Sequence, residues 1–148
     1  MGGIARLVAF LVFFQVGGVF AESFDQRAVT AEVSPKLLET LLRAIDGDYK
    51  EVGNNAYAFT VKGKYKVVFF NKIKDVQLFV LFDTNEVSLT RINDWNTNKR
   101  FSRAYLDREN RPALESDLDV EGGVTGESII RFIALFSESV EQFAEHIQ

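Results

Sequence analysis

The sequence predicts an α+β domain, a two-layer sandwich in which helices pack against a mostly antiparallel sheet. Three observations indicate this class. Residues 35–46 and 126–147 repeat their apolar side chains with the period of a helix. Residues 57–82 and 100–120 instead alternate or run continuously apolar, as strands do. Short turn sequences separate these runs, so the expected order of elements is α-β-β-β-α-β-β-α.

The first half of this order begins with a short helix. Ser34 can cap it and Pro35 suits its first position, while Gly47 ends it. Strands near 57–61, 65–71 and 76–82 then form a meander, with turns at 62–64 and 72–75. Because the strand 76–82 is apolar on both faces, we expect it to be central. The apolar stripe of the helix consists of Leu37, Leu38, Leu41, Leu42 and Ile45.

The second half begins with a helix that Ser88 or Thr90 can cap. A strand at 100–107, a four-residue loop at 108–111 and a returning strand at 112–120 form a hairpin. Pairing Asp107 with Pro112 would place Arg100 opposite Asp119. Thr125 can cap the last helix. The side chains that the middle helix is expected to bury are Leu89, Ile92 and Trp95.

Residues 1–21 are predicted to be a secretory signal peptide. Arg6 precedes the apolar run 7–14, a glycine pair follows, and the small residues Val19 and Ala21 suit cleavage after Ala21. A retained anchor is the alternative, but it needs about 18–20 uninterrupted apolar residues, and Gln15 interrupts this run. We therefore expect a periplasmic or secreted protein without stable membrane insertion. Residues 22–34 are expected to be a flexible leader and residues 35–148 the folded domain.

Composition excludes several classes of function. The chain of 148 residues has a formal net charge of −4, which argues against a nucleic-acid partner, since such proteins present a basic face. It contains no cysteine, so disulfides, thiol catalysis and thiolate metal sites are absent. An exported domain without disulfides must rely on packing, and 10 of the 14 phenylalanines of the chain remain after residue 21 to provide apolar bulk for it.

Four carboxylates follow one another at spacing two along the strand 112–120 and its end. This spacing places them on one face of the strand. We interpret that face as solvated, because side chains diverging along a strand do not converge as calcium ligands must. A divalent-ion or small-molecule site, or a surface for a basic partner, is the alternative. The residues are Glu115, Asp117, Asp119 and Glu121.

The last helix has more apolar surface than one sheet contact requires. Apolar residues that recur at alternating steps of four and three form a seam along this helix, and the seam must cover the sheet. The extra flank is expected to be buried by the first helix, or by a protein partner or a second copy of the chain. The seam consists of Ile129, Ile133, Phe136, Val140, Phe143 and Ile147. The candidate partner surface consists of Ile130, Phe132, Leu135, Phe136 and Phe143.

No catalytic set is evident, and no cofactor or metal is expected. His146 is the only histidine and lies in the last helical turn, where the helix dipole favours a cation. Gly122-Gly123 precedes a helix, but Glu121 beside it would repel a phosphate, so the pair is interpreted as a turn.

One stretch of the sequence carries a family resemblance. It has an N-x-W-N helix end at 93–96, K-R-F at 99–101, A-Y-L-D at 104–107 and an acidic strand before G-G-V-T at 122–125. In these features the sequence resembles the YbjN family of bacterial proteins, described as sensory transduction regulators. The residues that carry this pattern, and for which a structural role is expected, include Asn93, Trp95, Asn96, Arg100, Tyr105, Gly122 and Gly123.

The resemblance implies a fold similar to type III secretion chaperones, which often form dimers, and it implies no catalytic residues. Together with the signal peptide it predicts a non-enzymatic, chaperone-like binding or regulatory protein of the bacterial envelope, with a link to sensory transduction. A small-molecule or divalent-ion sensor that uses the acidic strand 115–121 is the alternative.

Overall fold

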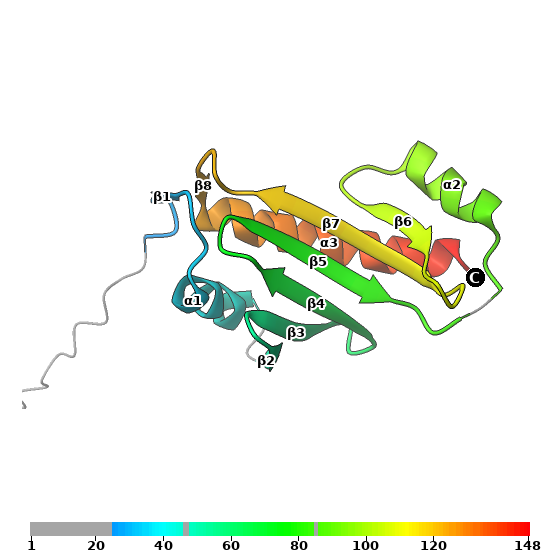
Figure 1. Ribbon diagram of the computed structural model, residues 1–148, viewed down its shortest axis with the longest axis horizontal. Coiled ribbons are helices and arrows are strands. Elements are labelled where there is room, and N and C mark those ends of the chain that lie inside the picture. The colour runs from blue at the N-terminus through cyan, green and yellow to red at the C-terminus, as the bar shows by residue number, and fades with distance from the viewer. Residues whose placement is uncertain (1–24, 46–47, 85) are drawn as a thin grey trace, which may run out of the picture.

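The protein folds as a six-stranded antiparallel sheet with helices on one of its faces (Figure 1). The computed structural model describes residues 25–45, 48–84 and 86–148. The predicted signal peptide therefore lies outside the described residues. The predicted α+β class and the mostly antiparallel sheet are confirmed, with the strand order β2-β3-β4-β5-β7-β6. No helix in the described part of the chain is long and apolar enough to cross a bilayer.

The elements have the following bounds. The strands of the main sheet are β2 (Lys50–Gly53), β3 (Ala56–Val61), β4 (Tyr65–Asn71), β5 (Asp75–Leu81), β6 (Arg103–Leu106) and β7 (Pro112–Asp119). The helices are α1 (Pro35–Ile45), α2 (Leu89–Asn98) and α3 (Gly126–His146). Two short strands, β1 (Val29–Thr30) and β8 (Val124–Thr125), form a separate pair.

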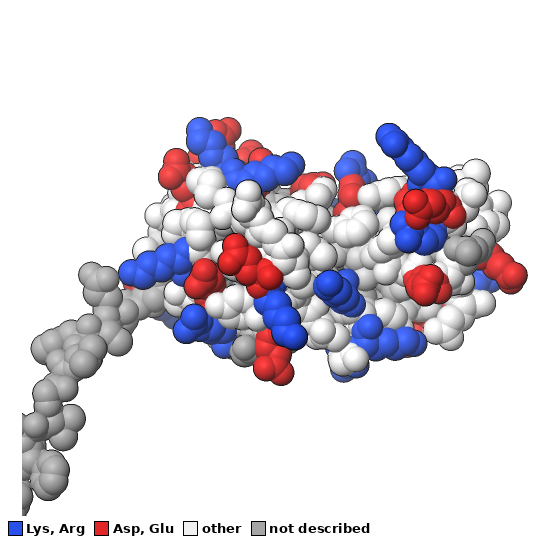
Figure 2. All heavy atoms as spheres, turned by 60° about the horizontal axis from the view of Figure 1, so that its bottom comes forward, with Lys and Arg blue, Asp and Glu red and all other residues white. Residues whose placement is uncertain are grey.

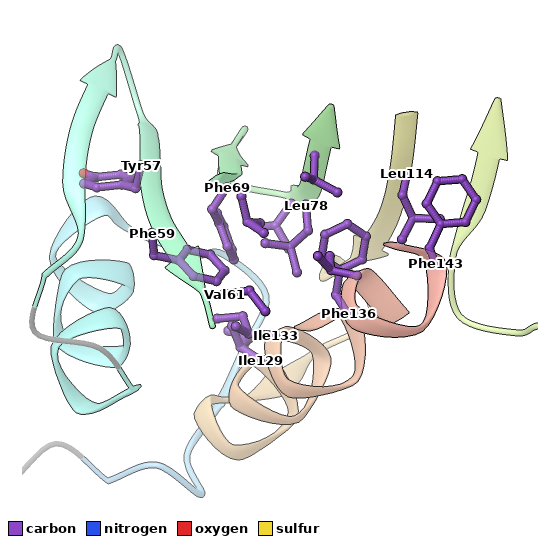
Figure 3. Close-up of a cluster of buried hydrophobic side chains, with 14 of the residues drawn as sticks. Tyr57, Phe59, Val61, Phe69, Leu78, Leu114, Ile129, Ile133, Phe136 and Phe143 are labelled. Carbon is purple, nitrogen blue, oxygen red and sulfur yellow. The ribbon is translucent and has the colours of Figure 1, made fainter. Parts of the chain in front are cut away.

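The core lies between the inner face of the sheet and the helices α1 and α3, which occupy the same side of the strands (Figure 3). Alternate strand residues point inward, as the period of two requires. The expected seam of α3 meets them, and Phe143 packs edge-on against Trp95 at a ring separation of 5.0 Å. Fully buried members of this core include Val67, Phe69, Leu78, Leu114, Ile129, Ile133, Phe136, Val140 and Phe143.

The expected helix starts agree with the structure. The hydroxyl oxygens of Ser88 and Thr125 accept the backbone N–H three residues later, which caps α2 and α3. Thr90 lies inside α2 and does not cap it. Leu89 was expected to be buried but is 65% exposed, because the first helical position faces solvent while Ile92 and Trp95 face the core.

The chain before α1 is packed rather than loose from Asp25 onward. Val33 is fully buried, and its C=O accepts a hydrogen bond from the buried Asn71 side chain at 2.8 Å. The strand β1 pairs with β8, and the C=O of Gln26 accepts the N–H of Glu127 at the start of α3. The prediction of a flexible leader over 22–34 is therefore wrong for its described part. A single buried valine among polar residues leaves no periodic pattern to recognise.

The hairpin register also differs from the expectation by one residue. Leu106 lies opposite Pro112, and Arg103, not Arg100, is in the strand. The reason is the loop, where Asp107 accepts the N–H groups of Arg111 and Glu109 and so belongs to the turn. These hydrogen bonds, above all the one from Arg111, hold the pKa of the Asp107 carboxyl below its usual value.

Candidate functional site

Half of one edge of β7 has no strand beside it (Figure 1). The short strand β6 pairs with β7 only from Pro112 to Glu115. Just before β6 begins, Phe101 adopts a positive φ of 66°. This turn carries the chain away from β7 before it can pair further. Ser116–Asp119 are therefore bonded to β5 on one side only, within the part of the chain that the structure describes. We call this segment the open edge of β7.

The backbone groups that face the open edge can be identified from the ladder. Successive residues of an antiparallel strand direct their N–H and C=O alternately to the two neighbours. The C=O of Pro112 and the N–H of Val120 bond on the β5 side, to Phe82 at 2.9 Å and Lys74 at 3.0 Å. Even-numbered residues thus face β5. The N–H and C=O groups of Asp117 and Asp119 consequently face outward, and no described residue bonds them on that side.

Carboxylates border the open edge on the outer face of the sheet. Asp117 and Asp119 are exposed there, and Asp117 accepts a hydrogen bond from Gln77 at 2.9 Å. Glu121 forms an ion pair with Lys74 at 2.9 Å. Their spacing follows the strand, and among the described residues no group of three or more His, Cys, Asp or Glu is arranged to hold a metal ion. The described geometry thus gives the divalent-ion alternative no support.

Glu115 differs from the other three carboxylates because it is only 5% exposed. The expectation that it lies on a solvated face is therefore wrong. One of its oxygens forms an ion pair with Arg103, and the other accepts the Tyr105 hydroxyl at 2.9 Å. Burial, and then the hydrogen bond to Glu115, raise the pKa of Tyr105 to about 12. These contacts lock β6 onto β7 and so fix the point at which the open edge begins.

One flank of α3 lies on the same side of the molecule as the open edge. Gln142 and His146 on this flank reach the α2 region, where His146 lies 2.8 Å from the C=O of Arg91. With 3.6 residues per turn, Phe132 and Leu135 fall on this same flank, whereas Ile130 falls on the opposite one. Phe132 and Leu135 are partly exposed. They are the apolar side chains of the predicted surface that lie on the inner side of the open edge.

The remaining members of the predicted partner surface are placed elsewhere. Phe136 and Phe143 are 1% and 0% exposed and belong to the core (Figure 3). Ile130 packs against the core from the flank that faces away from α2. The five residues therefore do not form one surface.

The charged side chains of the surface are interspersed. On the face shown in Figure 2, Lys and Arg alternate with Asp and Glu, and neither sign forms a continuous area. The carboxylates beside the open edge have basic neighbours too, since Asp117 lies 3.9 Å from Arg103 and Glu121 pairs with Lys74.

The comparisons with known proteins agree with this architecture. The family model of YbjN, described as "Putative bacterial sensory transduction regulator", matches residues 34–148. The chain belongs to the YbjN family. A comparison of this YbjN chain with curated proteins finds no match.

A solved structure resembles this YbjN chain. It is the Yersinia pestis type III secretion chaperone SycH, crystallised in complex with a stable fragment of YscM2. The TM-score is 0.55 at 17% sequence identity, with 76% of this chain and 98% of the SycH chain covered. At this identity the similarity shows the fold, which confirms the expected chaperone-like architecture.

The residues of the YbjN resemblance have structural contacts. Asn96 bonds the backbone of Ala104 in β6, and the buried Trp95 anchors α2 on the core. Asn93, by contrast, is exposed on α2. Arg100 stacks over the Phe101 ring, and the Gly122–Gly123 turn closes through the N–H of Gly123 and the C=O of Val120.

Sequence reasoning did not find the open edge itself. The residue types at 100–103 continue a strand pattern. The residue type of Phe101 does not predict its positive φ, because aromatic residues rarely adopt one. The run of carboxylates is the one feature of the sequence that pointed to this site.

Proposed function

We propose that this protein is an exported, non-enzymatic regulatory protein of the bacterial envelope that binds an extended segment of a partner protein along the open edge of β7. The observation that carries the proposal is the outward-facing backbone of Asp117 and Asp119. An extended segment can add a strand to such an edge through main-chain hydrogen bonds, and side chains on its two faces then provide specificity.

The chemistry beside the open edge defines the partner segment. Side chains that the added strand directs to the outer face would meet Asp117 and Asp119, which favours Lys or Arg. Those directed inward would lie on the side of Phe132 and Leu135, which favours apolar residues. The partner segment should therefore alternate basic and apolar residues over about four to six positions.

The same carboxylates disfavour pairing of this edge with a second copy of itself. Two β7 edges placed side by side would bring like charges together, which destabilises cross-strand neighbours. Charged edges of this kind commonly protect native sheets from edge-to-edge association. The partner at this edge is thus a different polypeptide.

The comparisons support a binding role rather than a catalytic one. The family is described as a regulator, and the structurally similar SycH was crystallised with a protein fragment. The predicted signal peptide at 1–21 supports export. Outside the cytosol the protein has no ATP to use, so binding would be passive and reversible burial of apolar surface and backbone groups.

Peptide binding tests the proposal. The chain from Glu22 is titrated into a fluorescent eight-residue peptide of alternating Lys and Val, with a Glu and Val peptide as the matched control. The Lys peptide should bind and the Glu peptide should not. Asp117→Pro, which removes one outward N–H, should abolish binding, while Glu138→Gln on the exposed side of α3 should not change it. Equal binding of both peptides, or full binding by Asp117→Pro, would overturn the proposal.

Export has a separate test. The full chain is expressed in a bacterium, and the intact mass of the protein in the periplasmic fraction is measured. The expected N-terminus is Glu22. A protein that keeps Met1 and sediments with membranes would contradict export as a released protein.

A further inference from the structure

The strand β6 limits how far a bound segment can run along the open edge of β7. It is antiparallel to β7 and begins at Arg103, which lies opposite Glu115. A segment that pairs with the open edge lies in the same line as β6 and meets its amino end. Such a segment can stay in the sheet no further than the position opposite Asp117, and there it must end or turn away.

The direction of the segment follows from the sheet. Every strand pair in the main sheet is antiparallel. At Asp117 and Asp119 the N–H and the C=O of one residue both face outward. This pattern suits an antiparallel neighbour, which exchanges both hydrogen bonds with the residue opposite. An antiparallel segment runs in the same direction as β6, so its carboxyl end points at the start of β6.

Cations lie where that end would arrive. The loop 99–102 joins α2 to β6 at the point where the open edge begins (Figure 1). It carries Lys99 and Arg100, which are both exposed, and no ion pair joins either of them to a carboxylate in the described part of the chain. Arg103, the next residue after the loop, lies 3.9 Å from Asp117 and offsets the charge of that carboxylate.

An aromatic ring lies beside these cations. Phe101 is 64% exposed, and the Arg100 guanidinium lies 5.6 Å from the centre of its ring. An arginine can bind a carboxylate through two parallel, charge-assisted hydrogen bonds. The exposed ring offers apolar contact to the last side chain of a bound segment. The loop therefore has the chemistry to receive the end of a polypeptide.

We propose that the segment bound at the open edge is the carboxyl-terminal end of a polypeptide, with its terminal carboxylate at the loop 99–102 beside Arg100. The inference rests on the proposed function and specifies its partner. Capture of a terminal carboxylate is a recurring mode of peptide recognition. The position opposite Asp117 lies on the outer face, so the last residue of the partner should be basic and the one before it apolar.

Calorimetry with the chain from Glu22 tests the inference. An eight-residue peptide of alternating Val and Lys, ending in Lys, is titrated in three forms: unmodified, amidated at the carboxyl end, and acetylated at the amino end. The unmodified peptide should bind about tenfold more tightly than the amidated one, because the amide loses a charge-assisted hydrogen bond. Acetylation should have a much smaller effect.

Net charge alone predicts the opposite order. The amidated peptide is more positive than the unmodified one and the protein is acidic, so general attraction would favour the amide. Arg100→Gln should reduce the tenfold difference to about twofold or less. Arg108→Gln, exposed in the hairpin loop at the other end of β6, is the matched control and should keep the full difference. Melting curves verify that both variants are folded.

The outcomes separate this inference from the proposed function. Equal binding of the unmodified and amidated peptides, or tighter binding of the amide, would overturn the inference alone. A larger effect of acetylation than of amidation would also overturn it, because the segment would then run parallel to β7. A tenfold difference that Arg100→Gln leaves unchanged would overturn the loop as the site of the carboxylate. If none of the three peptides binds, the proposed function fails as well.

Discussion

The side-chain amide of Asn96 in α2 bonds both backbone groups of Ala104 in β6. Its Nδ2 donates to the C=O at 2.9 Å, and its Oδ1 accepts the N–H at 2.8 Å. Asn96 thereby takes the place of a neighbouring strand at the outer edge of β6. The contrast with β7 is direct, because the edge of β6 is closed by a side chain while the adjoining edge of β7 is open.

Asn96→Ala should therefore destabilise the protein. Ala104 is 5% exposed, so its two backbone groups would lose their partners in a nearly buried position, at a cost of about 1–3 kcal/mol in the free energy of unfolding. Urea denaturation measures this. Asn93→Ala is the matched control and should change the stability by less than about 0.5 kcal/mol, because Asn93 is exposed. Equal effects of the two substitutions would contradict the role of Asn96.

Gly123→Ala should destabilise the protein where Gly122→Ala does not. Gly123 has a φ of +90°, and a Cβ there would lie 2.8 Å from a methyl group of Val29 in β1. The backbone strain alone should cost about 1–3 kcal/mol. A Cβ at Gly122 would meet no atom within 4 Å. Thermal melts of both variants make the comparison, and similar melting temperatures for the two would refute it.

The stability of the protein should fall between about pH 10 and pH 12. The pKa of Tyr105 is raised to about 12 in the folded protein, above the usual value of 10.0, so the neutral hydroxyl is favoured by folding. That contribution is complete below pH 10 and is lost as the pH approaches the folded pKa. Tyr105→Phe should lower the stability at pH 8 and remove this part of the alkaline loss, as chemical denaturation at several pH values would show. An unchanged alkaline loss would rule out Tyr105 as its source.

The segment before α1 should contribute to stability. Asn71 donates to the C=O of Val33 and accepts the N–H of Ile73, both at 2.8 Å, so it ties this segment to the β4–β5 turn. A chain that begins at Pro35 should melt at a lower temperature than one that begins at Asp25. The chain from Glu22 serves as the reference and should match the chain from Asp25. If all three melt together, the segment is not part of the folded unit.

Much of the fold could be predicted because local chemistry and packing agree. Ser88 and Thr125 are good caps followed by apolar helical spacing, and both begin helices in the structure. The strand β2 was missed, since its four residues are all exposed and leave no apolar alternation. The hairpin register was missed because Asp107 forms the turn through its side chain, which spacing alone does not reveal.

The candidate site was less predictable than the fold. The acidic run was visible, but Glu115 is buried and bonds Arg103 and Tyr105, and Arg103 lies opposite it only in a register one residue away from the expected one. Of the predicted apolar surface, Phe136 and Phe143 are core residues. Both also belong to the seam of α3, and the seam packs against the sheet. Which apolar flank remains exposed depends on how far the neighbouring strands extend, and this is a tertiary property.

The most direct test of the central claim is amide NMR of the chain from Glu22, titrated with the alternating Lys and Val peptide. Because odd-numbered residues of β7 face the open edge, the amides of Asp117 and Asp119 should shift and become protected from hydrogen exchange. Those of Ser116 and Leu118, already bonded to β5, should change little. Unchanged amides at 117 and 119, or shifts confined to the opposite edge strand β2, would contradict the account.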